Sequence, residues 1–321
     1  MQVAAKKELL EVQQFAQRVS ESVARAVVGK AEAVELCLLA LLAGGHVLLE
    51  DVPGVGKTTL AHALARSLGL PFSRIQFTSD LLPADIVGSA VPEAGKMDGT
   101  LRFAPGPVFA SVVLADELNR TSPRTQSSLL EAMSDGRVTV DGKTHALPDP
   151  FLVIATQNPL EHYGTYPLPE SQLDRFMLRL SVGYPSPEDE RRLLISREGG
   201  DPVAALEPVS SAEEVLALRK EVDHVRVERS VAEYVLHLAE ATRQSGEIAA
   251  GASTRATLAL TRLARGRALL RGRNYVTPAD VKALARPCWA HRLVLASGED
   301  PTRAQSEALL ESLVTEVPVP T

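Results

Sequence analysis

The sequence predicts an α/β fold, with a parallel-sheet core followed by a second domain that is all-helical. The apolar run Val47-Leu48-Leu49 leads into a loop rich in Pro and Gly and then into an alanine-rich segment with helical spacing, which is the order strand, loop, helix. Two more apolar runs are typical of buried parallel strands. The run at residues 111–117 ends in polar side chains, and the run at residues 151–156 is followed by them, as at the ligand-binding edge of a parallel sheet. Helix start signals recur from residue 184 onward. We therefore expect a core over residues 1–183, including an N-terminal helix, and a helical domain over residues 184–321.

The composition bounds the class of protein. A chain of 321 residues, 45% of them hydrophobic, is long enough for one large or two medium domains with a buried core. Only 4% of the residues are aromatic, which disfavours a large platform for stacking bases. The formal net charge of −6 argues against a protein that binds nucleic acid through a broad basic face, although it leaves local basic patches open.

Cys37 and Cys288 lie far apart in the chain and match no metal-binding spacing. We interpret both as core residues of a protein in a reducing compartment. The N-terminus lacks the basic and then apolar pattern of a secretion signal, and the longest apolar run, about 10 residues before Gly44, is too short to span a bilayer. We expect a cytoplasmic protein without membrane insertion.

The first part of the chain predicts two helices. Residues 5–27 carry apolar side chains at steps of three and four, and residues 31–43 are nearly all apolar and end at a glycine pair. Val28 and Gly29 lie in the break between these helices. The break could line an adenine pocket or could be a plain turn, and the sequence leaves both open.

The loop after the first strand has the composition of a phosphate-binding loop. Gly54 and Gly56 can adopt positive φ angles, and Lys57 opens the helix, where the dipole disfavours a cation unless an anion lies beside it. The hydroxyl of Thr58 is placed to complete the shell of a phosphate-bound Mg²⁺. The residues of this candidate site are Pro53, Gly54, Val55, Gly56, Lys57, Thr58 and Thr59. The match to G-x-x-x-x-G-K-[ST] is incomplete because Asp51 stands at the first glycine, and an ordinary Gly-rich turn is the alternative.

Two segments follow before the next buried strand. Residues 71–77 alternate like a strand, whereas residues 78–108 are rich in Gly and Pro with poor periodicity. A stretch this long and irregular inside a compact domain is usually functional or mobile. Within it, residues 96–99, which begin at Lys96, predict a hairpin turn between short extended arms.

Two adjacent carboxylates end the apolar strand of residues 111–117. Asp116 can hold Mg²⁺ through water, while Glu117, whose side chain points the opposite way, can orient and activate a water aimed at a γ-phosphate. The alternative is a strand that ends in solvated acids. Because a phosphate loop is present on the same chain, we favour the catalytic interpretation.

The next elements supply a third polar strand end. Thr121-Ser122-Pro123 predicts a helix start, and residues 137–140 predict a strand of a projecting hairpin, with turn signals at both ends. Asn158 follows the buried strand of residues 151–156, at the edge where an open parallel sheet binds ligands. It is a candidate for holding the attacking water or the γ-phosphate, and a turn-capping Asn is the alternative.

Arg175 precedes the last predicted strand, residues 177–182. It would lie at the edge of the sheet, near the level of the ligand crevice but displaced from the phosphate loop. That placement suits an arginine donated to the nucleotide of a neighbouring subunit. A solvated or ion-paired arginine is the alternative.

The C-terminal part reads as a series of capped helices, with a mobile linker predicted at residues 199–202. Capping patterns begin at Ser186, Ser211, Ser230 and Thr277. Ser253 caps one more helix, and Arg255 occupies its first turn, where the dipole penalises a cation. A phosphate would reverse this penalty, so Arg255 is a candidate phosphate contact, with a surface arginine as the alternative. The arginines from 262 to 273 surround a helix and indicate a solvated or subunit-contact face.

Together these segments resemble one family, the MoxR-type AAA+ ATPases, which are P-loop NTPases with a parallel-sheet core and a helical lid. The resemblance runs from about residue 20 to residue 290. It rests on residues 49–58 (LEDVPGVGKT), 115–120 (ADELNR) with 123–133 (PRTQSSLLEAM), 155–159 (ATQNP) and 168–176 (LPESQLDRF). An Asp at position 51 recurs in the loops of that family.

The resemblance implies roles for the matched positions. Lys57 and Thr58 would bind the phosphates of ATP and Mg²⁺, Asp116 would hold Mg²⁺, and Glu117 would be the catalytic base. Asn158 would be the first sensor, Arg255 the second sensor in the lid, and Arg175 the finger that acts in trans, with Arg120 and Arg179 as rival fingers.

The resemblance also implies partners. Relatives form rings, typically hexamers, in which residues 78–108 and the hairpin at 135–150 face the pore, and they remodel client proteins like chaperones, often with von Willebrand A-domain partners. Two other classes of function stay open. One is a nucleic-acid motor, in which Lys96, Arg102, Arg137 and Lys143 would touch phosphates. The other is an assembly scaffold with little turnover, against which the intact Glu117 argues.

Overall fold

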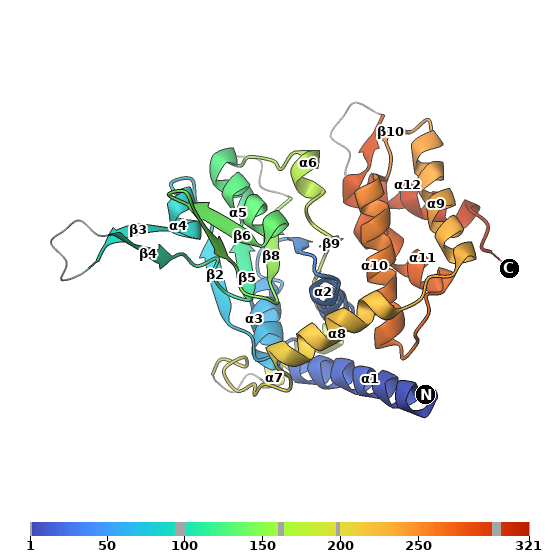
Figure 1. Ribbon diagram of the computed structural model, residues 1–321, viewed down its shortest axis with the longest axis horizontal. Helices are drawn as coiled ribbons and strands as arrows, with labels where there is room; N and C mark the ends of the chain where they lie inside the picture. Colours follow the sequence, from blue (N-terminus) through green and yellow to red (C-terminus); the bar gives the residue numbers. More distant parts are fainter. Residues whose placement is uncertain (1, 94–100, 160–163, 197–199, 297–302, 321) are drawn as a thin grey trace.

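The computed structural model describes residues 2–93, 101–159, 164–196, 200–296 and 303–320. A five-stranded parallel sheet forms the centre, with the strand order β2-β5-β8-β1-β9 (Figure 1). Its strands are β1 (Val47–Glu50), β2 (Phe72–Gln76), β5 (Val112–Asp116), β8 (Leu152–Gln157) and β9 (Leu178–Leu180). The predicted α/β core is confirmed, and β9 is the edge strand that the sequence predicts beside Arg175.

Alternate side chains of the central strands pack into two different layers. Val112 and Leu114 of β5 belong to a cluster with three helices on one face of the sheet, whereas Val113 and Ala115 pack with helix α5 (Pro123–Asp135) on the other. The three helices are α1 (Gln2–Ala24), α2 (Ala31–Ala43) and α3 (Lys57–Ser67). Because successive residues of a strand point to opposite faces, strands covered on both faces must be apolar throughout, as these are.

Helix termini follow the expected local chemistry. Gly44 adopts a left-handed conformation with φ +70° and ends α2. Ser122 caps α5 by accepting a hydrogen bond from the Thr125 amide, and Pro123 occupies the first helical position. Both boundaries were predicted from the sequence.

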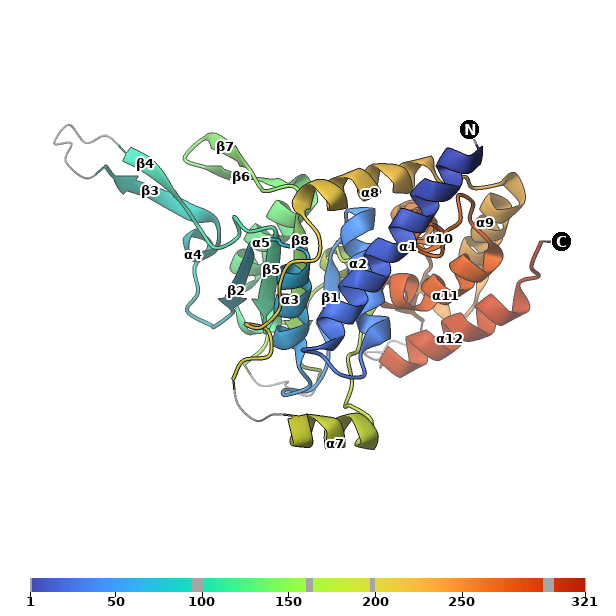
Figure 2. The same cartoon turned by 90° about the horizontal axis from the view of Figure 1, so that it is seen from below.

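Two hairpins project from one side of the core (Figure 2). The first follows the short helix α4 (Pro83–Val87) and pairs β3 (Gly88–Pro92) with β4 (Leu101–Pro105), and the second pairs β6 (Arg137–Val140) with β7 (Lys143–Ala146). The rings of Phe103 and His145 stack with centroids 3.8 Å apart, so the two hairpins are in contact. The predicted turn at Lys96 lies outside the described residues.

The C-terminal part is helical, with one short addition. Its helices are α7 (Pro187–Ser196), α8 (Ala212–His224), α9 (Arg229–Gln244), α10 (Thr254–Leu270), α11 (Pro278–Trp289) and α12 (Arg303–Glu316). A two-stranded ribbon, β10 (Ile248–Ala250) with β11 (Val294–Leu295), also occurs there, although no sequence pattern indicated it. The predicted linker at 199–202 lies partly outside the described residues.

The predicted caps of this region are confirmed except one. Ser186 and Ser211 accept hydrogen bonds from the amides of residues 189 and 214, and Thr277 forms a capping box with Asp280. The predicted cap at Ser230 is wrong: α9 begins at Arg229 after Glu228, so Ser230 lies inside the first turn. The N-cap residue of α9 is Glu228, which has an extended conformation.

The C-terminal helices pack against the N-terminal helices. Residues of α8, α10 and α11 share one buried apolar cluster with α1, α2 and α3, and α10 lies against both α1 and α2. Cys37 and Cys288 are both free and fully buried in this cluster, and burial raises the pKa of the Cys288 thiol to about 11. Within the described residues, no helix combines the length and apolarity needed to cross a bilayer.

Candidate functional site

The loop between β1 and α3 has the backbone that its glycines predict. Gly54 and Gly56 have φ angles of +86° and +90°, and Gly56 is the N-cap of α3. No atom lies within 4 Å of where a Cβ would stand at either position, so conformation rather than space requires glycine there. The loop therefore leads into the N-terminus of α3, whose first amides have no acceptor within the helix itself, an arrangement that binds anions.

Lys57 is held by the start of its own loop. Its Nζ donates to the carbonyl oxygen of Asp51 at 2.7 Å and to that of Val52 at 3.4 Å. These carbonyls offset the cost of a cation at a helix N-terminus. They also fix where the ammonium lies.

One hydroxyl on β8 joins both acidic residues at the end of β5, Asp116 through its carboxylate and Glu117 through its backbone amide. Thr156 Oγ1 donates to Asp116 Oδ1 at 2.7 Å and accepts from the Glu117 amide at 2.8 Å. Glu117 has φ +58°, a left-handed conformation that costs a non-glycine residue about 1–2 kcal/mol. Backbone strain of this kind concentrates at functional sites. The sequence placed Asp116 and Glu117 correctly at the strand end but gave no role to Thr156.

A neighbouring strand contributes two more polar residues that sequence reasoning missed. Arg74 of β2 donates to Asp116 Oδ2 from Nη2 at 2.6 Å and from Nε at 3.1 Å, and its Nη2 also donates to Gln76 Oε1 at 2.7 Å. The Gln76 Nε2 donates to Glu117 Oε2 at 2.8 Å. The alternation of β2 was the available signal, because Arg74 and Gln76 share one face and Gln76 is in register with Asp116.

These groups surround a cavity of about 350 Å³. It is lined by Pro53, Gly54, Gly56, Lys57, Thr58, Thr59, Arg74, Asp116, Glu117, Thr156 and Asn158. Most of the predicted phosphate-loop residues therefore meet Asp116, Glu117 and Asn158 in one place. Val55 is instead buried in the apolar core, at 8% exposure, so only its backbone can serve a ligand.

The donor set of this cavity fits a magnesium ion bound with a nucleotide. Thr58 and Asp116 offer a hydroxyl and a carboxylate, which are the hard oxygen ligands that Mg²⁺ prefers. The described residues contain no cluster of three or more His, Cys, Asp or Glu side chains that could hold a metal alone. Mg²⁺ typically keeps waters and phosphate oxygens and takes only one or two protein ligands, which agrees with this sparse set.

A second cavity, of about 640 Å³, is lined by residues of both the core and the lid. Gly29, Asp51 and Arg179 line it from the core, and Arg286, Arg303 and Glu307 line it from the lid. Val28 lies next to Gly29 but lines neither cavity. Burial lowers the pKa of the Arg179 guanidinium, and the Glu50 carboxylate, 3.7 Å away, opposes this shift.

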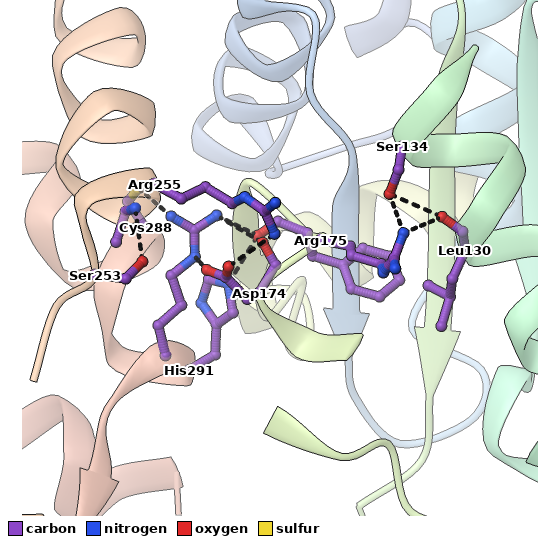
Figure 3. A network of polar contacts seen from close by, with 11 residues as sticks. Leu130, Ser134, Asp174, Arg175, Ser253, Arg255, Cys288 and His291 are labelled. Atoms are coloured by element: carbon purple, nitrogen blue, oxygen red, sulfur yellow. Dashed lines mark hydrogen bonds and ion pairs between the residues drawn. The ribbon is translucent and has the colours of Figure 1, made fainter. Parts of the chain in front are cut away.

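Arg175 and Arg255 lie outside both cavities. Arg175 donates to the Leu130 carbonyl at 2.9 Å and to the Ser134 hydroxyl, both on α5, while Arg255 donates to Asp174 Oδ2 at 3.2 Å (Figure 3). The rival fingers are also paired within the chain, since Arg120 lies 3.2 Å from Glu117 and Arg179 faces Glu50. The structure thus brings together the phosphate loop, Asp116, Glu117 and Asn158, but not the predicted Arg175 and Arg255.

Comparisons with known proteins agree with this geometry. Residues 46–178 match the family described as "ATPase family associated with various cellular activities (AAA)", and residues 240–313 match the AAA lid domain. The chain is 45% identical to the chaperone MoxR1 of Mycobacterium tuberculosis over 85% of this chain and 74% of that protein. This chain belongs to the MoxR family of AAA+ ATPases.

Two further relatives span nearly the whole of this MoxR-type ATPase. The protein YeaC of Bacillus subtilis is 48% identical over 94% of this chain and 93% of its own. The crystal structure of a proposed ATPase from Cytophaga hutchinsonii superposes with a TM-score of 0.89 at 35% identity, covering 99% of this chain and 98% of that one. The predictions of a P-loop core, a helical lid and ATPase activity are therefore confirmed.

Proposed function

We propose that this ATPase uses hydrolysis to remodel partner proteins in the manner of a chaperone, and that ATP and Mg²⁺ bind in the cavity of about 350 Å³. The observation that carries the proposal is the convergence of Lys57, Thr58, Asp116, Glu117 and Asn158 on that single cavity. A phosphate loop, an acid pair and a polar strand end are the parts that phosphoryl transfer to water requires.

The proposed chemistry is an in-line attack of water on the γ-phosphate. A bond forms between the water oxygen and phosphorus, the bond from phosphorus to the β,γ-bridging oxygen breaks, and ADP leaves while Glu117 takes the water proton. Lys57 and the α3 amides bind the phosphates, and Asn158 orients the water or the γ-phosphate. Mg²⁺, held by Thr58 and through water by Asp116, would neutralise charge on the phosphate oxygens when bound.

Arg255 and Arg175 have separate roles in the proposal. In the proposal, Arg255 of the lid contacts the phosphates as the second sensor. Arg175 reaches the nucleotide of the next subunit in a ring, for which we propose a hexamer. Both now bond within the chain, through Asp174 and α5, so each must exchange those contacts to act. The proposed boundary between core and lid follows Gly183.

The two projecting hairpins are the proposed client contacts. The stacked Phe103 and His145 join them, so they can move as a unit when the lid and core shift. A von Willebrand A-domain protein is the proposed class of partner. We also propose the cytoplasm as the location, because both cysteines are free thiols.

The test is ATP hydrolysis measured against protein concentration, with mass from light scattering in parallel, for the wild type, Arg175→Ala and the control Arg124→Ala. Arg124 is exposed on α5 and has no proposed role. Turnover should rise as rings form, and Arg175→Ala should lower it by about 10³-fold in an assembled ring, as loss of an arginine finger does. The control should match the wild type.

Two outcomes would contradict the proposal. Turnover that does not depend on concentration, from a monomer, would exclude sites shared between subunits. Turnover that nucleic acid stimulates, with binding that weakens steeply as salt rises, would favour the nucleic-acid motor instead.

A further inference from the structure

Asp51 stands where a glycine is expected, yet the backbone there does not need glycine. The positive φ angles of this loop occur at Gly54 and Gly56, and Asp51 is not among the positive-φ residues of the described chain. An aspartate therefore fits without strain.

The Asp51 carboxylate is buried, with 7% of the residue exposed, and it bonds to the segment that leads from β9 to α7. Oδ1 accepts from Ser181 Oγ at 2.7 Å, and Oδ2 accepts from the Val182 amide. The Gly183 amide points at both oxygens, at 3.2 Å and 3.3 Å. A buried carboxylate is costly unless several donors satisfy it, and here three successive residues do so.

The same residue touches the phosphate-binding side through its backbone. Its carbonyl oxygen accepts from Lys57 Nζ at 2.7 Å. An ammonium has three donors, so Lys57 can keep this bond and still bind a phosphate. Asp51 thus connects the proposed phosphate ligand Lys57 with residues 181–183.

The preceding residue is bonded to the lid. Arg303 of α12 donates from Nη1 to the Glu50 carbonyl at 3.3 Å, and Glu50 Oε2 lies 3.9 Å from Arg303 and 3.7 Å from Arg179. Glu50 and Asp51 both line the 640 Å³ cavity between core and lid. The end of β1 is therefore in contact with the phosphate loop, the β9–α7 segment and the lid at once.

We propose that Asp51 is a positioning residue that ties the phosphate loop to the core–lid connection, so that occupancy of the phosphate site and the position of the lid are coupled through its carboxylate. This inference rests on the proposed nucleotide site. The coupling is reciprocal: whatever moves residues 181–183 changes the affinity of the loop for nucleotide, and nucleotide biases the lid.

The test separates the side chain of Asp51 from its backbone. Asp51→Gly restores the glycine of the phosphate-loop pattern and keeps the carbonyl that holds Lys57, but it removes the carboxylate. Ser181, Val182 and Asp51 all line the cavity, so water can satisfy the freed donors and the variant should fold. Asp51→Asn keeps the shape and one acceptor oxygen and serves as the conservative variant.

Lid position is read from spin labels on Glu131→Cys and Glu240→Cys, exposed positions on α5 and α9. The native thiols will not compete for label, because both are buried and burial raises the pKa of Cys37 to about 12. The probe is ATPγS with Mg²⁺, its binding measured separately by titration. The matched control is Asp201→Gly, which removes an aspartate that accepts one backbone bond, from the Val203 amide at 2.9 Å, far along the chain from the loop.

In the protein that carries the two labels and native Asp51, ATPγS should change the distance between the labels. In Asp51→Gly the shift should disappear while ATPγS affinity falls by no more than about fivefold, the low end of typical coupling. Asp51→Asn should keep part of the shift, and Asp201→Gly should keep all of it.

Two outcomes contradict the inference without contradicting the proposed nucleotide site. One is an unchanged shift of the label distance in Asp51→Gly, and the other is a labelled protein with native Asp51 that binds ATPγS without any shift of that distance. If that labelled protein shows no saturable binding of ATPγS, the proposed function fails first, and this inference fails with it.

Discussion

Arg255 and Asp174 form an ion pair across the interface of lid and core, with Arg255 Nη1 3.2 Å from Asp174 Oδ2 (Figure 3). The other oxygen of Asp174 lies 3.3 Å from Nε of Arg292, a side chain only 4% exposed. Arg292 and His291 also bond to the carbonyl of Phe176, at 2.9 Å each. The residues on both sides of Arg175 are thus fastened to the lid, whereas the side chain of Arg175 bonds to α5 instead. The carboxylate of Asp174 is shared by the proposed second sensor, Arg255, and by Arg292.

Asp174→Asn should weaken this attachment. The change removes the charge that faces two guanidinium groups, one of them almost fully buried, and should lower the free energy of unfolding by about 1–3 kcal/mol. Denaturant unfolding measures the loss. The control is Asp223→Asn, whose pair with Arg262 at 3.4 Å is largely exposed and should contribute about 0–1 kcal/mol. Equal losses in the two variants would contradict a special role for Asp174.

Glu117→Gln should separate binding from turnover. The amide cannot take the proton of the attacking water, so kcat should fall by about 10²–10⁴-fold while ATP still binds. Steady-state hydrolysis and nucleotide titration measure the two effects. Glu131→Gln, an exposed change on α5, is the control and should leave both unchanged. Retained turnover in Glu117→Gln would show that another group is the base.

Arg74→Met should make the protein more dependent on Mg²⁺ and nucleotide for stability. Arg74 supplies two of the hydrogen bonds to Asp116, which is only 8% exposed, so its loss leaves a buried carboxylate short of donors and should cost about 1–3 kcal/mol. Mg²⁺ with ATPγS should restore more of the melting temperature in the variant than in the wild type. A variant that melts like the wild type without ligand would contradict this account.

His46 should contribute to acid sensitivity. Burial lowers its pKa to about 4, although the hydrogen bond to the Met133 carbonyl opposes this shift. The neutral ring fits its surroundings, since Nδ1 accepts from the Val153 amide at 3.0 Å and Nε2 can donate to the Met133 carbonyl at 2.9 Å. The histidine pKa in the unfolded state is near 6.5, so between about pH 6.5 and 4 the unfolded state binds more protons than the folded state. The contribution of neutral His46 to the free energy of unfolding is therefore fully present above about pH 6.5 and is lost as the pH falls toward 4. Buried His291, whose pKa burial also lowers, acts in the same direction.

The check is the slope of unfolding free energy against pH between 6 and 4.5. His46→Gln can replace both hydrogen bonds without titrating, so the slope should fall by up to about 1.4 kcal/mol per pH unit. His237→Gln, on the exposed side of α9, should not change it. An unchanged slope in His46→Gln would mean that other groups carry the acid sensitivity.

Much of the fold could be predicted because its signals are local. Gly54 and Gly56 are glycines for a conformational reason that acts at each residue alone, and both have the positive φ angles expected. Asp116, Glu117 and Asn158 were placed at strand ends by hydrophobic runs of a few residues, and parallel strands bring such ends to one edge of a sheet. The cap at Ser230 was misplaced because a Ser-x-x-Glu pattern does not distinguish a cap from a first turn. Glu228, two residues earlier, ends the extended segment and is the N-cap instead.

What the sequence by itself determined was the type and order of most elements, the phosphate loop and the acid pair, since each depends on residues close together in the chain. The ribbon of β10 and β11 was not among them, because its strands are distant in the chain. Only the tertiary structure decided the partners of the charged groups. Arg74 meets Asp116 across 42 positions, Asp51 meets Ser181 across 130, and Arg255 meets Asp174 across 81. Periodicity and capping carry no information about such pairs. A long charged side chain on a surface can interact with many different partners, and only the packing of the sheet and lid selects one of them.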